Sequence, residues 1–115
     1  MTDSRPTIVV AMNDGLTEAH LAEVFHGIEE EGIPYSVRIL PCTDARDLAH
    51  SAAIESRLGV GVGAADHSVV VTTEKLPARQ PYITQPLNST PDLDRVVGQN
   101  AARLTKRIPL LTMSN

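Results

Sequence analysis

The chain has 115 residues, 42% of them hydrophobic, a formal net charge of −4 and one cysteine, Cys42. This length suits one compact domain, which we expect to cover residues 1–115 with flexible ends at 1–6 and 110–115. The acidic balance and the scarcity of aromatic residues, 3% of the chain, exclude a typical nucleic-acid binder. No internal disulfide can form, no apolar run is long enough to span a bilayer and no signal-peptide pattern is present, so we expect a cytoplasmic protein with no membrane partner.

The first strand and the first helix have clear local signals. Residues 7–12 form a short apolar run rich in β-branched side chains, which is typical of a strand covered on both faces. After a turn at residues 13–15, Thr17 is expected to cap a helix whose apolar positions recur every three or four residues as far as Ile28. Gly32 then provides the left-handed residue that commonly ends a helix.

The predicted end of this helix carries three consecutive glutamates, Glu29, Glu30 and Glu31. Each carboxylate there is unfavourable by a few tenths to about 1 kcal/mol, because the C-terminal end of the helix dipole is already partly negative. Two interpretations stay open. The run is either a solvated acidic surface or a set of carboxylates presented to a cation or a basic partner.

The remaining elements continue the alternation of strands and helices. In chain order we expect a strand at 35–40, a helix from Thr43 or Asp44 to about Arg57, strands at 58–65, 69–73 and 81–85, and a helix from about Asp92 to Lys106 or Arg107. This alternation predicts an α/β layered domain with a mainly parallel sheet. The short turn at Asp66 makes the strand after it antiparallel to the one before it, so the sheet is expected to be mixed.

A glycine-rich stretch within residues 58–65 partly matches a dinucleotide-binding fingerprint. Gly59, Gly61 and Ala64 have the G-x-G-x-x-A spacing. That motif needs a helix after it, however, whereas a strand is expected here. Close approach of neighbouring backbone is therefore the preferred interpretation.

No set of residues has the spacing of a self-contained catalytic or metal site. The four histidines lack the i, i+4 spacing of a helical metal pair, and no serine stands in a nucleophile elbow. Asn100 stands apart because it lies on the apolar stripe of the last helix. It either bonds a loop carbonyl at the edge of the stripe or makes a polar contact across an interface, and we include it among the predicted interface residues.

Several segments of the chain match the pattern of one known family. The two most specific matches are Gly27-Ile-Glu-Glu-Glu-Gly-Ile-Pro-Tyr35 and Gln99-Asn-Ala-Ala-Arg-Leu-Thr-Lys-Arg-Ile-Pro109. Supporting matches occur in the corresponding order at Asn13-Asp-Gly15, Leu58-Gly-Val-Gly-Val-Gly and Lys75-Leu-Pro-Ala78. Over nearly its whole length the chain resembles the small subunit of the diol/glycerol dehydratase reactivating factors. The resemblance implies the fold of the medium subunit of cobalamin-dependent dehydratases, a three-layer α/β/α domain with a mixed, mainly parallel sheet of about five strands.

The same resemblance implies a chaperone subunit with no catalytic activity of its own. In that family the small subunit pairs with a large ATPase subunit, typically two of each, and ATP or ADP binds to the large subunit. The small subunit exchanges with the medium subunit of a dehydratase, which loosens the enzyme and frees its damaged cobalamin. The implied setting is the cytoplasm, including a bacterial microcompartment, and the target stays open between a diol and a glycerol dehydratase.

The resemblance also implies a role for the acidic run. The middle glutamate, here Glu30, would complete a Mg²⁺ or Ca²⁺ site at the contact with the large subunit, because a carboxylate is a suitable hard oxygen ligand. Glu29, Glu31 and Asn100 are assigned to the interface, and the isolated chain is expected to hold no cofactor and only an incomplete metal site.

Two other functions stay open at this point. The chain could be the medium subunit of a dehydratase itself, or a stand-alone small-molecule-binding α/β domain. The second alternative needs a pocket with converging polar groups at the C-terminal ends of the strands. The sequence offers no such convergent set.

Overall fold

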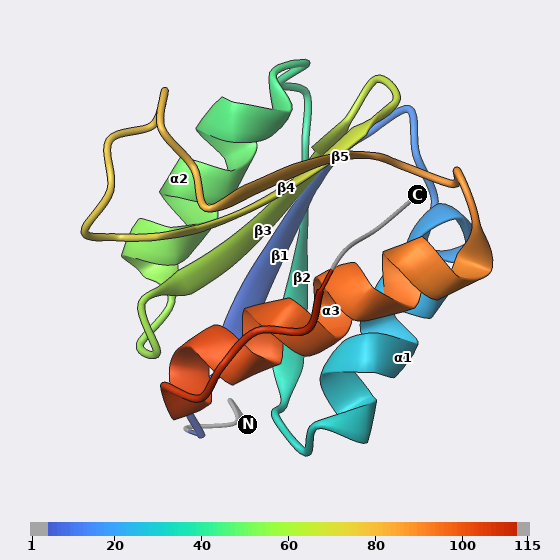
Figure 1. Ribbon diagram of the computed structural model, residues 1–115. Coiled ribbons are helices and arrows are strands. Elements are labelled where there is room, and N and C mark those ends of the chain that lie inside the picture. The colour runs from blue at the N-terminus through green and yellow to red at the C-terminus, as the bar shows by residue number, and fades with distance from the viewer. Residues whose placement is uncertain (1–4, 113–115) are drawn as a thin grey trace.

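The computed structural model describes residues 5–112, which form a five-stranded sheet with helices on both faces (Figure 1). In chain order the elements are β1 (Ile8–Asn13), the 3-10 helix η1 (Glu18–Leu21), α1 (Ala22–Glu30), β2 (Tyr35–Leu40), α2 (Ala45–Glu55), β3 (Val60–Ala65), β4 (Ser68–Thr73), β5 (Ile83–Pro86) and α3 (Pro91–Lys106). Helix α2 lies on one face of the sheet, whereas α1 and α3 lie side by side on the other (Figure 1). The predicted three-layer α/β/α architecture is therefore confirmed. Parts of the ends expected to be flexible, residues 1–4 and 113–115, lie outside the described residues.

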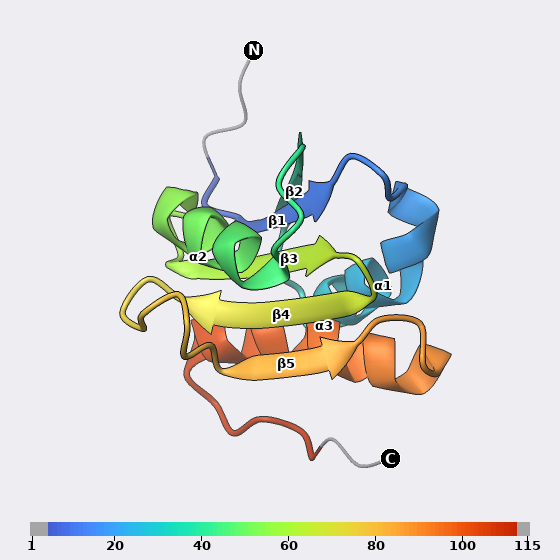
Figure 2. The same ribbon diagram turned by 90° about the horizontal axis from the view of Figure 1, so that it is seen from above.

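The sheet is mixed, with the strand order β2-β1-β3-β4-β5 and with β2 and β5 at its two edges (Figure 2). Strand β1 pairs in parallel with β2 and β3, whereas β4 is antiparallel to both β3 and β5. In this sheet β4 alone runs against the common strand direction, as the short turn predicted. That turn contains Asp66, whose φ of 59° lies in the left-handed region.

Alternation along β1 divides the core between the two helical layers. Ile8, Val10 and Met12 are fully buried in the larger hydrophobic cluster, which includes residues of α1 and α3. Val9 and Ala11 face the other way and pack with α2 in the smaller cluster. Burial on both faces explains why this strand is a nearly continuous apolar run.

Two glycines of β3 allow α2 to lie directly against the backbone of the sheet. A Cβ atom on Gly61 would lie 2.2 Å from the Ala53 nitrogen, and one on Gly63 would lie 2.2 Å from the Ala45 carbonyl oxygen. The next element after β3 is the strand β4 and not a helix. Close backbone packing is thus confirmed as the role of the glycine-rich stretch, in place of a dinucleotide-binding turn.

Several element boundaries differ by one or two residues from the sequence-based expectation, among them the start of β5 at Ile83 and the end of α2 at Glu55, and two of the differences have a clear local cause. The first helix begins as the 3-10 turn η1, where the Thr17 N–H donates to His20 Nδ1 at 2.9 Å, and such turns are frequent at helix N-termini. The strand β3 begins at Val60, two residues later than expected, because Gly59 has a φ of 74° and belongs to a turn. Among the residues that the structure describes, no helix is both long and apolar enough to cross a membrane.

Candidate functional site

The acidic run of the sequence forms the end of α1, as predicted. The helix ends at Glu30, Glu31 is its C-cap residue, and Gly32 has a φ of 79°. The Gly32 N–H donates to the Glu29 carbonyl oxygen at 2.9 Å, which closes the last turn. All three carboxylates therefore lie within one turn of the helix terminus.

Helix α3 crosses α1 very closely, and this contact positions the acidic end of α1. Gly27 lies at the crossing, where a Cβ atom would be 2.0 Å from the Arg95 carbonyl oxygen. Beside the crossing, four polar residues of α3 recur every three or four positions. We call them the α3 polar row: Arg95, Gln99, Arg103 and Lys106. The sequence contained this spacing, but only the packed structure shows that the row faces the glutamates of α1.

Glu31 is bound within the chain. Its carboxylate accepts hydrogen bonds from Lys106 Nζ at 2.8 Å and from Arg103 Nε at 3.2 Å, and its side chain is only 13% exposed. Lys106 also donates to the Glu31 carbonyl oxygen at 2.9 Å. The hydrogen bond from Lys106, assisted by the charge of Arg103, holds the pKa of Glu31 below its usual range, although burial acts in the opposite direction. The unfavourable negative charge at this helix end is thus compensated by α3.

Glu23, in the first turn of α1, forms a second link between the helices. Its Oε1 accepts two hydrogen bonds from Arg95, from Nε at 3.0 Å and from Nη2 at 2.7 Å. The hydrogen bond from Arg95 lowers the pKa of Glu23. Two charge-assisted hydrogen bonds to one oxygen fix the orientation of the Arg95 side chain against α1.

Among the three glutamates that contact the α3 polar row, Glu30 has the most exposed side chain. Its side chain is 49% exposed, and its Oε1 accepts a hydrogen bond from Gln99 Nε2 at 3.2 Å and lies 3.9 Å from Arg95 Nε. Both contacts involve the same oxygen, so the carboxylate retains capacity for a further ligand. Glu29, its neighbour, is also exposed.

This chain by itself does not build a cation site around Glu30. Within residues 5–112, no group of three or more His, Cys, Asp and Glu side chains could hold a metal ion. The neighbours of Glu30 are an arginine and an amide nitrogen, which are not cation ligands. A Ca²⁺ ion takes roughly six to eight oxygen ligands. Glu30 can therefore supply one carboxylate to such an ion, and the other ligands would have to come from another molecule or from water.

Asn100 is buried and lies away from any open surface of the described chain. It is 1% exposed, its Nδ2 donates to the Leu111 carbonyl oxygen at 3.1 Å, and its Oδ1 accepts from the Leu111 N–H at 2.6 Å. Of the two interpretations of Asn100, the structure supports the bond to a loop carbonyl and gives no support to the interface contact. The same pair of hydrogen bonds ties Leu111 to α3, although this residue belongs to the end that we expected to be flexible.

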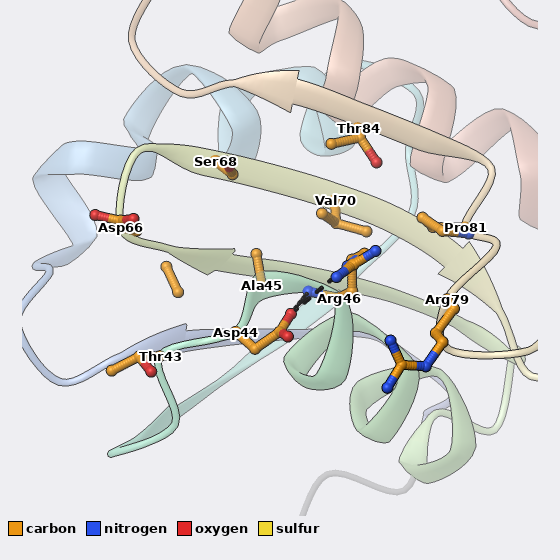
Figure 3. Close-up of a pocket in the computed structure, with 11 residues that line it drawn as sticks. Thr43, Asp44, Ala45, Arg46, Asp66, Ser68, Val70, Arg79, Pro81 and Thr84 are labelled. Atoms are coloured by element: carbon orange, nitrogen blue, oxygen red, sulfur yellow. Dashed lines mark hydrogen bonds and ion pairs between the residues drawn. The ribbon is translucent and has the colours of Figure 1, made fainter.

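A second candidate site is a pocket of about 500 Å³ beside the carboxyl end of β3 (Figure 3). Its polar lining comes from four places along the chain: Thr43, Asp44 and Arg46 at the start of α2, Asp66 and Ser68 at the turn into β4, Arg79 in the 74–82 loop, and Thr84 in β5. Sequence reasoning missed this convergence because each contributing segment is separate and has no motif of its own.

The family model "Dehydratase medium subunit" matches residues 5–111, and the chain belongs to this family.

Within this family, the chain is similar to small subunits of dehydratase-reactivating factors. The chain is 43% identical to the propanediol dehydratase-reactivating factor small subunit of Salmonella typhimurium, over 92% of this chain and 90% of the relative. It is 38% identical to the diol dehydratase-reactivating factor small subunit of Klebsiella michiganensis, over 97% of this chain and 89% of the relative. The resemblance seen in the sequence is confirmed.

Two solved structures have the same fold. A chain of the diol dehydratase-reactivating factor complexed with ADP and Mg²⁺ has a TM-score of 0.87 and 41% identity, covering 95% of this chain and all of that chain. A chain of a glycerol dehydratase reactivase has a TM-score of 0.90 and 30% identity, covering 96% of this chain and all of that chain.

Proposed function

We propose that this chain is the non-catalytic small subunit of a factor that reactivates a cobalamin-dependent diol or glycerol dehydratase. The observation that carries the proposal is the 43% identity to a reactivating factor small subunit across 92% of the chain. In this proposal the chain pairs with a large ATPase subunit, two of each, and the large subunit binds ATP or ADP. The complex acts where the dehydratase is, in the cytoplasm or in a bacterial microcompartment.

Subunit exchange is the proposed mechanism of reactivation. The family that contains this chain is named after the dehydratase medium subunit, so the reactivating subunit and the enzyme subunit share a fold. Two proteins with one fold can present the same face to a common partner. This chain would thereby trade places with the medium subunit, and the loosened dehydratase would release its damaged cobalamin.

The docking contact that we propose is the acidic end of α1. Glu30 is half-exposed, and its two contacts within the chain use the same carboxylate oxygen. A Mg²⁺ or Ca²⁺ ion at the subunit contact would supply the positive charge that this carboxylate can bind. Arg103 and Lys106 hold Glu31 against α3, so the helix end is rigid before the partner arrives. Glu29 lies beside Glu30 as a supporting surface group.

The experiment that tests this function is a reactivation assay with purified components. A dehydratase inactivated during turnover is mixed with intact adenosylcobalamin, ATP and either the large subunit alone, this chain alone, or both. We expect activity to return only with both subunits. Equal recovery with the large subunit alone would contradict the proposal.

A second measurement distinguishes the reactivating role from the alternative that this chain is the medium subunit of a dehydratase. This chain is added to a dehydratase that lacks its medium subunit, and diol or glycerol turnover is measured together with cobalamin binding. The reactivating role predicts no turnover in this assembly. Substantial turnover would show that the chain is an enzyme component instead.

A further inference from the structure

The pocket lies beside the carboxyl end of β3, on the α2 side of the sheet. In open α/β sheets, ligands bind outside the carboxyl ends of the strands. Ala65 and Asp66 at the end of β3, together with residues 43–46 before and at the start of α2, line the pocket at this place.

Two arginines from separate elements extend into this pocket. Figure 3 shows the Arg46 side chain reaching from α2 toward β4, and the Arg79 side chain reaching from the 74–82 loop toward α2. Arg79 makes no hydrogen bond or ion pair with any residue that the structure describes. The Nε of Arg46 lies 3.9 Å from Asp44 Oδ1, an oxygen that already accepts the N–H groups of Arg46 and Asp47 as the cap of α2.

The lining has no net formal charge, since Asp44 and Asp66 balance the two arginines. Asp44 is engaged by Arg46 and by the cap of α2, however, and Arg79 has no partner among the described residues, so the guanidinium of Arg79 has donors open to an anion. A guanidinium offers a planar fork of donors that fits a carboxylate or a phosphate. The hydroxyl groups of Thr43, Ser68 and Thr84 line the same space and can donate further hydrogen bonds.

We propose that this pocket binds a small organic oxyanion, a carboxylate or a phosphate, between Arg46 and Arg79. Its volume of about 500 Å³ lies within the usual range of small-molecule sites. Asp66 in the lining disfavours a second anionic group, so the ligand carries one such group and is otherwise neutral or positively charged. The site lies on the α2 side of the sheet, whereas the proposed docking contact lies on the α1 and α3 side, so the two proposals are independent.

The test is an NMR titration of the isotope-labelled full-length chain at constant ionic strength, with inorganic phosphate and with acetate in separate arms. We expect saturable shifts of the Ser68, Thr84 and Arg79 signals with at least one ion, and the tighter ion identifies the preferred group. Loss of a charged hydrogen bond should weaken binding about tenfold in Arg79→Gln. Lys75→Gln is the matched control, because it removes one positive charge from an exposed position of the same loop outside the pocket.

The outcomes of the titration are decisive. Saturation by phosphate or acetate, with Arg79→Gln clearly weaker than Lys75→Gln, supports the site, and Arg46→Gln should weaken binding in the same way. Shifts that rise linearly with both ions, or an equal effect of Arg79→Gln and Lys75→Gln, would overturn it. The spectrum of each variant shows directly whether its fold is retained.

Discussion

Gly98 of α3 lies against Val24 of α1 so closely that a Cβ atom on the glycine would be 2.0 Å from the Val24 carbonyl oxygen. Gly27 makes the reciprocal approach to α3. The two helices therefore touch along their backbones at one crossing point. This contact sets the distance between the α3 polar row and the acidic end of α1, and so it determines where Glu30 is held.

Gly98→Ala should destabilise the protein. Alanine favours a helix by about 1 kcal/mol over glycine. The added methyl group must push the helices apart, and overpacking of this kind costs about 1–3 kcal/mol and occasionally more. Because a Cβ atom 2.0 Å from a backbone oxygen is a severe clash, the upper end of that range applies, and we expect a net loss of about 2 kcal/mol in the free energy of unfolding, measured by urea denaturation. Unchanged or increased stability of Gly98→Ala would show that the close crossing is not maintained in solution.

Gly32→Ala provides the contrast for this experiment. No atom lies within 4 Å of the position that its Cβ would take, but its φ of 79° is in the left-handed region. The cost there comes from the backbone and should be about 1 kcal/mol. Gly32→Ala should therefore leave the contact between α1 and α3 intact, which the NMR signals of Gln99 and Arg103 can report.

Asn100→Ala should release the C-terminal segment. The substitution removes two hydrogen bonds and leaves the N–H and C=O groups of Leu111 without these partners. We expect a loss of about 1–3 kcal/mol in unfolding free energy and faster proteolytic cleavage after residue 107, followed by mass spectrometry. Gln99→Ala, which alters the neighbouring residue without touching the segment, should leave cleavage there unchanged. Equal cleavage in both variants would contradict this role of Asn100.

The pairing of Glu31 predicts a pH-dependent contribution to stability. Because the folded pKa of Glu31 is lowered, its contribution is complete above the usual glutamate pKa of about 4.3 and is lost as pH falls through the lower folded value. Glu31→Gln should thus be about 1 kcal/mol less stable than the wild type at pH 7. The difference should shrink as the pH falls, and urea unfolding at a series of pH values measures it. A difference that stays constant down to pH 3 would contradict the pairing.

Asp94 should stabilise the folded protein as the pH falls, which is opposite to the effect of Glu31. It is 2% exposed, and burial raises its pKa although the Asn88 N–H donates to its carboxylate. Its ionised form is therefore disfavoured in the folded state, and protonation on acidification favours folding. Asp94→Asn should make the acid side of the stability profile steeper, because the loss from Glu31 is then no longer offset.

Most elements could be predicted because their signals are local. The period of apolar residues revealed the helices, and the turn at Asp66 predicted the direction of β4. Even the end of α1 at Gly32 followed from residue chemistry alone. Fold class and element order thus needed no information on contacts between distant residues.

The candidate sites were harder to predict, because they depend on contacts between distant residues. The sequence does not reveal that Arg103 and Lys106, more than 70 positions after Glu31, bind its carboxylate within the chain. The place of Asn100 on an apolar stripe likewise does not reveal that Leu111 covers it, and the interface roles of both residues stay predictions. The meeting of Arg46 and Arg79 in one pocket depends on the path of a loop that has no periodic pattern.

Glu30 is proposed to bind a divalent cation where this chain contacts the large subunit. The most direct measurement is the affinity of the large subunit for this chain, with and without Mg²⁺, for the wild type and for Glu30→Gln. The amide oxygen of glutamine can still accept the hydrogen bond from Gln99, so the variant removes the charge and little else. Asp47→Asn, which removes one exposed charge from α2 on the opposite face, is the matched control.

We expect Glu30→Gln to bind the large subunit about ten- to a hundredfold more weakly and to lose its response to Mg²⁺, because losing a charged ligand costs about 1.5–3 kcal/mol. Asp47→Asn should bind like the wild type. Equal affinity and an equal response to Mg²⁺ in Glu30→Gln and the wild type would contradict a cation site at Glu30.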